Sequence, residues 1–174
     1  MIALRARLGA PGGLTSPSAF AYDPAMRIAL FQPDIAGNVG TILRLSACFG
    51  VPCDIIEPCG FPFSDRALKR AGMDYAALAH VARHADWEAF RAAPAPGRLV
   101  LLSSKASGSL YDFAFEADDR LLFGSESAGV PEDVRMSADA AVRIPMRADL
   151  RSLNLAVSAG IALAEALRQT GQLP

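Results

Sequence analysis

Short apolar runs alternate with longer, mixed segments along most of the chain. The runs are rich in Ile, Leu, Val and Phe, as in strands that are buried on both faces of a sheet. They predict strands at residues 27–32, 53–56, 98–102, 120–123 and 141–144. The segments between them predict helices at 38–49, closed by Gly50, and at 65–71, 86–92 and 152–170. Strands separated by helices indicate an α/β domain with a mostly parallel sheet flanked by helices.

The predicted last helix is apolar on nearly every side. It shows almost no polar face before Glu165 and Arg168. A helix of this kind must be buried on more than one side. In so small a domain, we expect the second side to lie against another copy of the chain. The helix therefore predicts a homodimer.

The length of 174 residues suits one compact domain, which we expect to span residues 26–174. The first 25 residues are rich in Ala, Gly, Pro and Ser and lack the apolar core of a signal peptide. We expect them to be a mobile leader, or a stretch upstream of the true start at Met26. No apolar run reaches the roughly 18 residues that a membrane span needs.

The overall charge argues against a broadly basic surface. The formal net charge is −1 and the pI is about 6.1, whereas nucleic-acid-binding proteins are usually strongly basic. Any RNA site must therefore be a local patch or be assembled across subunits. The candidates are a basic face on the helix at 65–71 and arginines elsewhere, although a solvated charged face is the alternative for each. They are Arg66, Lys69, Arg70, Arg83, Arg147 and Arg151.

Cysteines and histidines give no sign of a metal centre. Cys48, Cys53 and Cys59 lack the paired spacing of metal fingers, and we interpret them as reduced thiols of a cytoplasmic protein. His80 and His84 share the i, i+4 spacing of a helix, but nothing places a third ligand near them. We therefore expect histidines that lie on the surface or pack against neighbours, and no bound metal.

Three polar clusters follow predicted strands. The first, residues 36–44, carries Asn38, which is placed to cap a helix, beside glycines that let a ligand approach the backbone. It has neither the spacing of a dinucleotide fingerprint nor that of a phosphate-binding P-loop. The second, residues 122–131, turns through Glu126, and the third, residues 143–155, leads into the last helix. Each alone fits an ordinary connection, but ligands bind at the carboxyl ends of parallel strands.

Together the clusters resemble the three motifs of the SPOUT RNA 2′-O-methyltransferases. The matching residues, in order, are Asn38-x-Gly40-x-x-x-Arg44, Phe123-Gly124-x-Glu126-x-x-Gly129-x-Pro131, Ile144-Pro145-Met146 and Ser152-Leu153-Asn154-Leu155. Residues 26–171 as a whole are similar to the subfamily that methylates the wobble ribose of tRNA, at cytidine or modified uridine. The resemblance implies S-adenosylmethionine as cofactor, S-adenosylhomocysteine as product, and tRNA as partner.

The resemblance also implies features of the fold that the pattern of residues does not predict. Members of this family have a deep C-terminal trefoil knot, in which the chain from the second motif onward threads through a loop. Threaded chains are nearly absent among folds, so physical reasoning alone would not expect one. The family further implies an obligate homodimer with the active site near the subunit interface.

The implied site divides into a cofactor part and a ribose part. The cofactor part consists of Leu102, Gly124, Ile144, Met146, Ser152 and Leu153. The ribose part consists of Asn38, Arg44, Glu126, Ser152 and Asn154. In it, Asn38 and Asn154 orient the ribose, while Glu126 holds the loop or Arg44 in place.

Arg44 matches the arginine that the family places at the ribose. A guanidinium has a pKa above about 12 and does not serve as a base in proteins. We therefore expect Arg44 to clamp the target phosphate and to stabilise the developing alkoxide. The substrate phosphate or Ser152 would then relay the hydroxyl proton.

Three other readings remain open. A related 2′-O-methyltransferase acting on ribosomal RNA or on another tRNA position uses the same chemistry. A non-catalytic RNA-binding or ribosome-assembly protein could keep the fold, although the presence of all five ribose-site residues argues against lost catalysis. A dinucleotide-dependent enzyme lacks its glycine fingerprint here.

Overall fold

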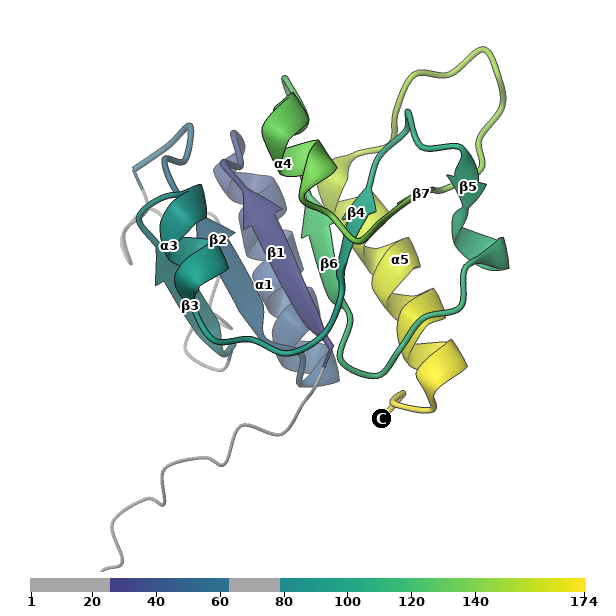
Figure 1. Ribbon diagram of the computed structural model, residues 1–174, viewed down its shortest axis with the longest axis horizontal. Coiled ribbons are helices and arrows are strands. Elements are labelled where there is room, and N and C mark those ends of the chain that lie inside the picture. Colours follow the sequence, from purple (N-terminus) through teal and green to yellow (C-terminus); the bar gives the residue numbers. More distant parts are fainter. Residues whose placement is uncertain (1–25, 63–78) are drawn as a thin grey trace, which may run out of the picture.

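A parallel sheet forms the centre of the molecule (Figure 1). The computed structural model describes residues 26–62 and 79–174. Within them, seven strands form one sheet in the order β3-β2-β1-β6-β4-β7-β5, and all neighbouring strands are parallel. The strands are β1 (Arg27–Phe31), β2 (Cys53–Ile56), β3 (Val81–His84), β4 (Leu99–Leu102), β5 (Gly108–Ser109), β6 (Arg120–Phe123) and β7 (Ala140–Arg143). The helices are α1 (Ala36–Phe49), α3 (Trp87–Ala92), α4 (Glu132–Met136), α5 (Leu155–Thr170) and the short 3-10 helix η1 (Leu110–Asp112).

The α/β class and the parallel sheet predicted from the sequence are confirmed. β1, β2, β4, β6 and β7 coincide with the predicted strands to within about one residue at each end. The pattern missed β3, because this strand at the sheet edge is only half-buried and carries Arg83 and His84. It also missed β5 and α4, which are too short for a periodic signal.

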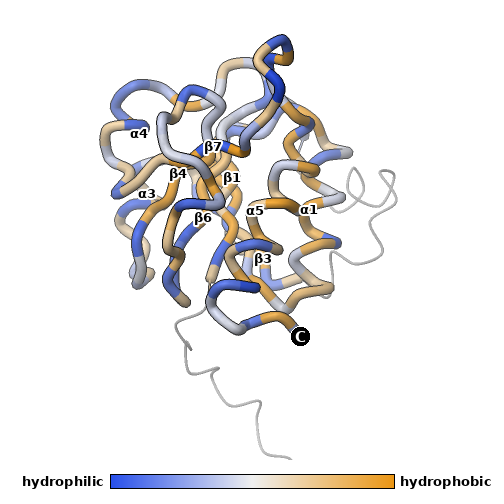
Figure 2. The backbone as a smooth tube through the Cα atoms, turned by 90° about the vertical axis from the view of Figure 1, so that its right-hand side faces the viewer, coloured by the Kyte–Doolittle hydropathy of each residue, from blue (hydrophilic) through white to orange (hydrophobic). Residues whose placement is uncertain are grey.

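Helices cover both faces of the sheet because alternate residues of each strand point to opposite sides. On one face, Ile28 and Leu30 join the large core cluster that β1 shares with α1 and α5. On the other face, Ala29 and Phe31 join a smaller cluster with Phe90 of α3 and with α4. Figures 1 and 2 show α1 and α5 side by side against the sheet, where they contact each other.

The strand register brings the carboxyl ends of the central strands into line. Phe123 of β6 pairs with Leu30 of β1 on one side and with Leu102 of β4 on the other. Leu102 in turn pairs with Val142 of β7. The segments that follow these four strands therefore begin at the same edge of the sheet. This carboxyl edge is where parallel sheets bind their ligands.

Both long helices begin at residues other than those predicted. α1 begins two residues before Asn38, with Ile35 at the N-cap and no side-chain cap, so the capping role predicted for Asn38 is wrong. α5 begins at Leu155, later than predicted, because Asn154 is the N-cap and accepts from the amides of Ala156 and Val157. The predicted end of α1 is confirmed, since Gly50 adopts a left-handed conformation with φ of 67°.

Two predictions fall outside the described residues: the leader at 1–25 and the basic helix at 65–71. Among the helices of residues 26–62 and 79–174, none has the length and apolarity to cross a bilayer. The last helix is buried on one side only within a single copy. Its opposite side leaves Val157 50% exposed.

Candidate active site

A chain of hydrogen bonds joins the three polar clusters at the carboxyl edge of the sheet. Glu126, in the loop after β6, accepts the Nδ2 of Asn38 at 2.7 Å and the backbone amide of Asp34 at 2.7 Å. Asn154 donates its Nδ2 to the Oδ1 of Asn38 at 2.9 Å. Hydrogen bonds thereby join residues from three distant parts of the chain, and their role as one active site stays a prediction.

The chain of hydrogen bonds has a direction that the carboxylate sets. An ionised carboxylate only accepts hydrogen bonds, so Asn38 must turn its amino group toward Glu126. Its carbonyl oxygen then faces Asn154, which donates its own amino group and keeps its oxygen for the start of α5. Asn38 is buried, and its amide is thus held in one orientation.

Residues 124–131 form a tight loop whose two ends are bonded together. The amides and carbonyls of Ser125 and Gly129 exchange hydrogen bonds of 3.0 and 2.9 Å. A Cβ at Gly124 would lie 2.4 Å from the carbonyl carbon of Gly129. Packing within the protein therefore already requires glycine at position 124. That Gly124 also admits a cofactor remains a prediction.

Apolar side chains flank this loop. Leu102 and Ile144 are half-buried and pack against the large core cluster, and Met146 is half-buried as well. Leu153, just before α5, is 38% exposed. Leu102 ends β4, while Gly124 and Ile144 come directly after β6 and β7, the two neighbours of β4 in the sheet. Apolar side chains such as these suit contact with an adenosine.

The other predicted ribose-site residues are accessible. Arg44 lies further along α1 with its side chain exposed, and Ser152 is exposed in the segment before α5. Neither position conflicts with the predicted role, and the roles stay predictions.

The predicted RNA-binding residues have different surroundings. Arg147 and Arg151 are both exposed, and Arg147 forms an ion pair with Asp149 at 3.1 Å. Arg83 forms an ion pair with Glu57 at 2.7 Å. The remaining candidates, Arg66, Lys69 and Arg70, lie outside the described residues.

Asp34 is a site residue that sequence reasoning missed. It lies shortly after β1, which ends at Phe31, and its carboxylate accepts both the backbone amide and the hydroxyl of Ser127, at 2.9 and 2.6 Å. Both bonds lower the pKa of Asp34, the hydroxyl bond more than the amide bond. A carboxylate at the end of a buried strand was the signal that would have identified it.

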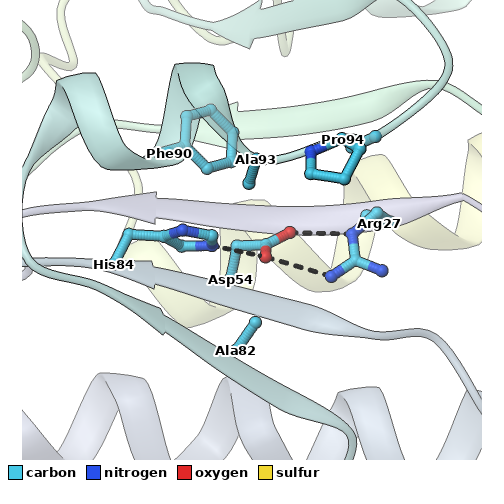
Figure 3. A pocket seen from close by; sticks show the side chains of 8 residues that line it. Arg27, Asp54, Ala82, His84, Phe90, Ala93 and Pro94 are labelled. Atoms are coloured by element: carbon cyan, nitrogen blue, oxygen red, sulfur yellow. Dashed lines mark hydrogen bonds and ion pairs between the residues drawn. The ribbon is translucent and has the colours of Figure 1, made fainter.

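A second polar cluster lies within the sheet, at a pocket shown in Figure 3. Asp54 of β2 accepts from Arg27 at 2.8 and 3.0 Å and lies 2.9 Å from the Nε2 of His84. Arg27 begins β1, so this cluster is at the opposite end of that strand from Asp34. His84 belongs to β3, so His80 and His84 do not share one face of a helix. The expected packing role of His84 is confirmed, because its ring packs against that of Phe90. The described residues contain no group of three or more potential metal ligands.

The fold and the site define an α/β protein with a hydrogen-bonded polar centre at the carboxyl ends of β1, β6 and β7. Residues 25–164 match the model of the SpoU rRNA Methylase family, and the chain belongs to this family.

Relatives with known names support a narrower grouping. A tRNA (cytidine(34)-2′-O)-methyltransferase of Beijerinckia indica is 58% identical over 148 residues, which cover 84% of this chain and 92% of the relative. A solved structure described as giving insight into the 2-OH methylation of C/U34 on tRNA superposes with a TM-score of 0.77. It is 42% identical, over 84% of this chain and 97% of that one. An AdoMet-bound rRNA methyltransferase from Sinorhizobium meliloti superposes with a TM-score of 0.71 at 31% identity, over 83% of this chain and 56% of that one.

Proposed function

We propose that the protein is an S-adenosylmethionine-dependent methyltransferase that modifies the ribose 2′-oxygen of the wobble nucleotide of tRNA, at cytidine or modified uridine. The observation that carries the proposal is the hydrogen-bond chain through Asn38, Glu126 and Asn154 at the carboxyl edge of the sheet. The close relative from Beijerinckia indica has the same named activity and matches nearly its full length. The AdoMet-bound relative supports the choice of cofactor.

The described residues fit this cofactor. Leu102, Ile144 and Met146 offer apolar contact, while the backbone of the 124–131 loop and of the segment before α5 offers hydrogen-bond partners. S-adenosylmethionine, when bound, supplies an activated methyl group on a sulfonium. The protein must then align the ribose hydroxyl with this group and help to remove the hydroxyl proton.

Side chains at the other end of the site act on the ribose. The amides of Asn38 and Asn154, locked by Glu126, present fixed polar groups for orienting it. Arg44 stays charged, so we assign it to the target phosphate and to the developing negative charge on the 2′-oxygen. The substrate phosphate or Ser152 relays the hydroxyl proton away from the 2′-oxygen. Replacing Arg44 with Lys keeps the charge but removes the bidentate clamp, and we expect a large loss of methyl transfer.

The deciding experiment follows labelled methyl from S-adenosylmethionine into bulk tRNA that lacks wobble methylation, with the modified nucleotide then mapped. We expect a 2′-O-methyl group at the wobble ribose. The Asn154→Ala variant serves as the inactive control. Label in ribosomal RNA alone would show that the substrate is ribosomal RNA and not tRNA. Cofactor binding without label in any RNA would indicate a binding protein.

We propose that the tRNA site includes basic residues from two parts of the chain. Arg66, Lys69 and Arg70 are the strongest candidates by sequence, with the exposed Arg147 and Arg151 beside the site. Reversing Arg66, Lys69 and Arg70 to Glu should weaken tRNA binding and flatten its dependence on salt. Unchanged binding would remove this segment from the site.

A homodimer is proposed from the outer side of α5. Val157, Gly160, Ile161 and Ala164 recur at helical spacing and are at least partly exposed, beside the exposed Leu153. An apolar stripe of this kind is typical of a subunit interface. We expect light scattering to show a dimer, and Val157→Glu with Ile161→Glu to yield monomers that no longer transfer methyl groups. A monomeric wild-type protein would contradict this proposal.

The deep trefoil knot of the family is also proposed for the C-terminal segment. The sheet order supports it, because β4 lies between β6 and β7 although both follow it in the chain. An enzyme acting on tRNA is expected in the cytoplasm.

A further inference from the structure

Asp34 lies at a junction of three segments. Its backbone amide donates to the Oε2 of Glu126 at 2.7 Å, and its carboxylate accepts from Ser127. On its other side, the amide of Gly60 donates to the carbonyl of Pro33 at 2.9 Å. A Cβ at Gly60 would lie 2.9 Å from the Cα of Asp34, so the two backbones are in close contact. Asp34 thus stands between the start of α1, the 124–131 loop and the segment after β2.

The bonds of Asp34 fix the loop that carries Glu126. Glu126 and Ser127 are neighbours in sequence, and both are bonded to this one residue, the first through the backbone and the second through the side chain. The loop is also closed on itself by the pair between Ser125 and Gly129. The carboxylate of Asp34 therefore joins the closed loop to the sheet edge, 93 residues away in sequence.

Resting on the proposed function, we propose that Asp34 is a positioning residue for methyl transfer. By bonding to Ser127, it holds the 124–131 loop where the backbone can bind S-adenosylmethionine and where Glu126 can orient Asn38. Asp34 need not touch either substrate. One oxygen of Asp34, Oδ2, accepts both donors of Ser127, so a single accepting oxygen at this position is enough to hold the loop.

The test measures binding of S-adenosylhomocysteine by calorimetry, together with kcat and KM for methyl transfer. Asp34→Ala should weaken binding about tenfold or more, since loss of alignment at a reacting centre costs factors of this order. Asp34→Asn keeps the shape and one accepting oxygen, so it should retain most of the affinity. Ser127→Ala removes only the hydroxyl donor and should have a smaller effect, and the double variant with Asp34→Ala should be no worse than Asp34→Ala alone. The KM for tRNA should stay near that of the wild-type protein.

Glu88→Ala is the matched control, because it removes one exposed negative charge from α3, at the far edge of the sheet. A merely structural role for Asp34 would lower the melting temperature and leave the affinity of the folded protein unchanged. Wild-type affinity and kcat in Asp34→Ala would overturn the inference while leaving the proposed function intact. A wild-type protein that bound no S-adenosylhomocysteine would overturn both.

Discussion

Glu126 shows how a single carboxylate organises the site. Its two oxygens serve different segments: one accepts from the backbone of Asp34 and the other from the side chain of Asn38. Because the amide of Asn38 is thereby oriented, that of Asn154 is oriented as well. A polar network of this kind is stable only while each donor faces an acceptor.

We expect Glu126→Gln to disturb this network more than its shape suggests. Glutamine presents one oxygen and one amino group, so either Asp34 or Asn38 would face a donor. The partly buried donor left without an acceptor should cost about 1–2 kcal/mol of unfolding free energy. The kcat/KM for methyl transfer should also fall, by more than the loss of stability accounts for, since both asparagine amides lose their fixed orientation. Chemical denaturation and steady-state kinetics check this, with the exposed Glu88→Gln as control; wild-type kcat/KM in Glu126→Gln would show that the network is dispensable.

Among the short elements, the 124–131 loop depends on two glycines for different reasons. Gly129 has a φ of 72°, a conformation that side chains with a Cβ rarely adopt. Gly124 has no such φ but packs directly on the backbone of Gly129. The loop is therefore closed by a backbone contact that no larger residue permits.

Gly124→Ala should force this loop open. The added methyl would lie 2.4 Å from the carbonyl carbon of Gly129, which is backbone and cannot rotate away. Overpacking of this kind costs about 1–3 kcal/mol, and binding of S-adenosylhomocysteine should weaken in parallel. Gly37→Ala in α1 is the matched control for stability, because a Cβ there meets no atom within 4 Å. Equal melting temperatures for the two variants would contradict the packing argument.

The positions of the strands could be predicted from the sequence more closely than the beginnings of the helices. Buried strands such as β1 and β6 have continuous apolar runs, and their positions were predicted closely. The N-terminus of α1 was not, because local statistics favour Asn38 as a cap. Its amide is instead used by Glu126, 88 residues away in sequence. Contacts over such distances leave no trace in a local pattern.

At the scale of the whole molecule, the sequence predicted a parallel sheet but not its strand order. The order places the ends of β1, β6, β4 and β7 side by side, and this alone brings the three polar clusters together. Local pattern cannot supply it, since pairing between strands far apart in sequence is decided by the packed core. The family resemblance predicted the residues of the site from their order and spacing along the chain, and their roles stay predictions.

The polar cluster of Arg27, Asp54 and His84 is expected to act on stability and not on the reaction. Asp54 is 3% exposed and accepts from both partners, and the cluster belongs to β1, β2 and β3, with Arg27 at the end of β1 opposite the active site. Asp54→Ala removes the carboxylate that faces a buried guanidinium, and breaking a buried pair in this way costs about 3–5 kcal/mol. The melting temperature should fall steeply, whereas the affinity of the folded fraction for S-adenosylhomocysteine should match that of the wild-type protein. Asp112→Ala, at an exposed aspartate of η1, is the control. A stable Asp54→Ala variant with weakened cofactor binding would instead couple this cluster to the active site.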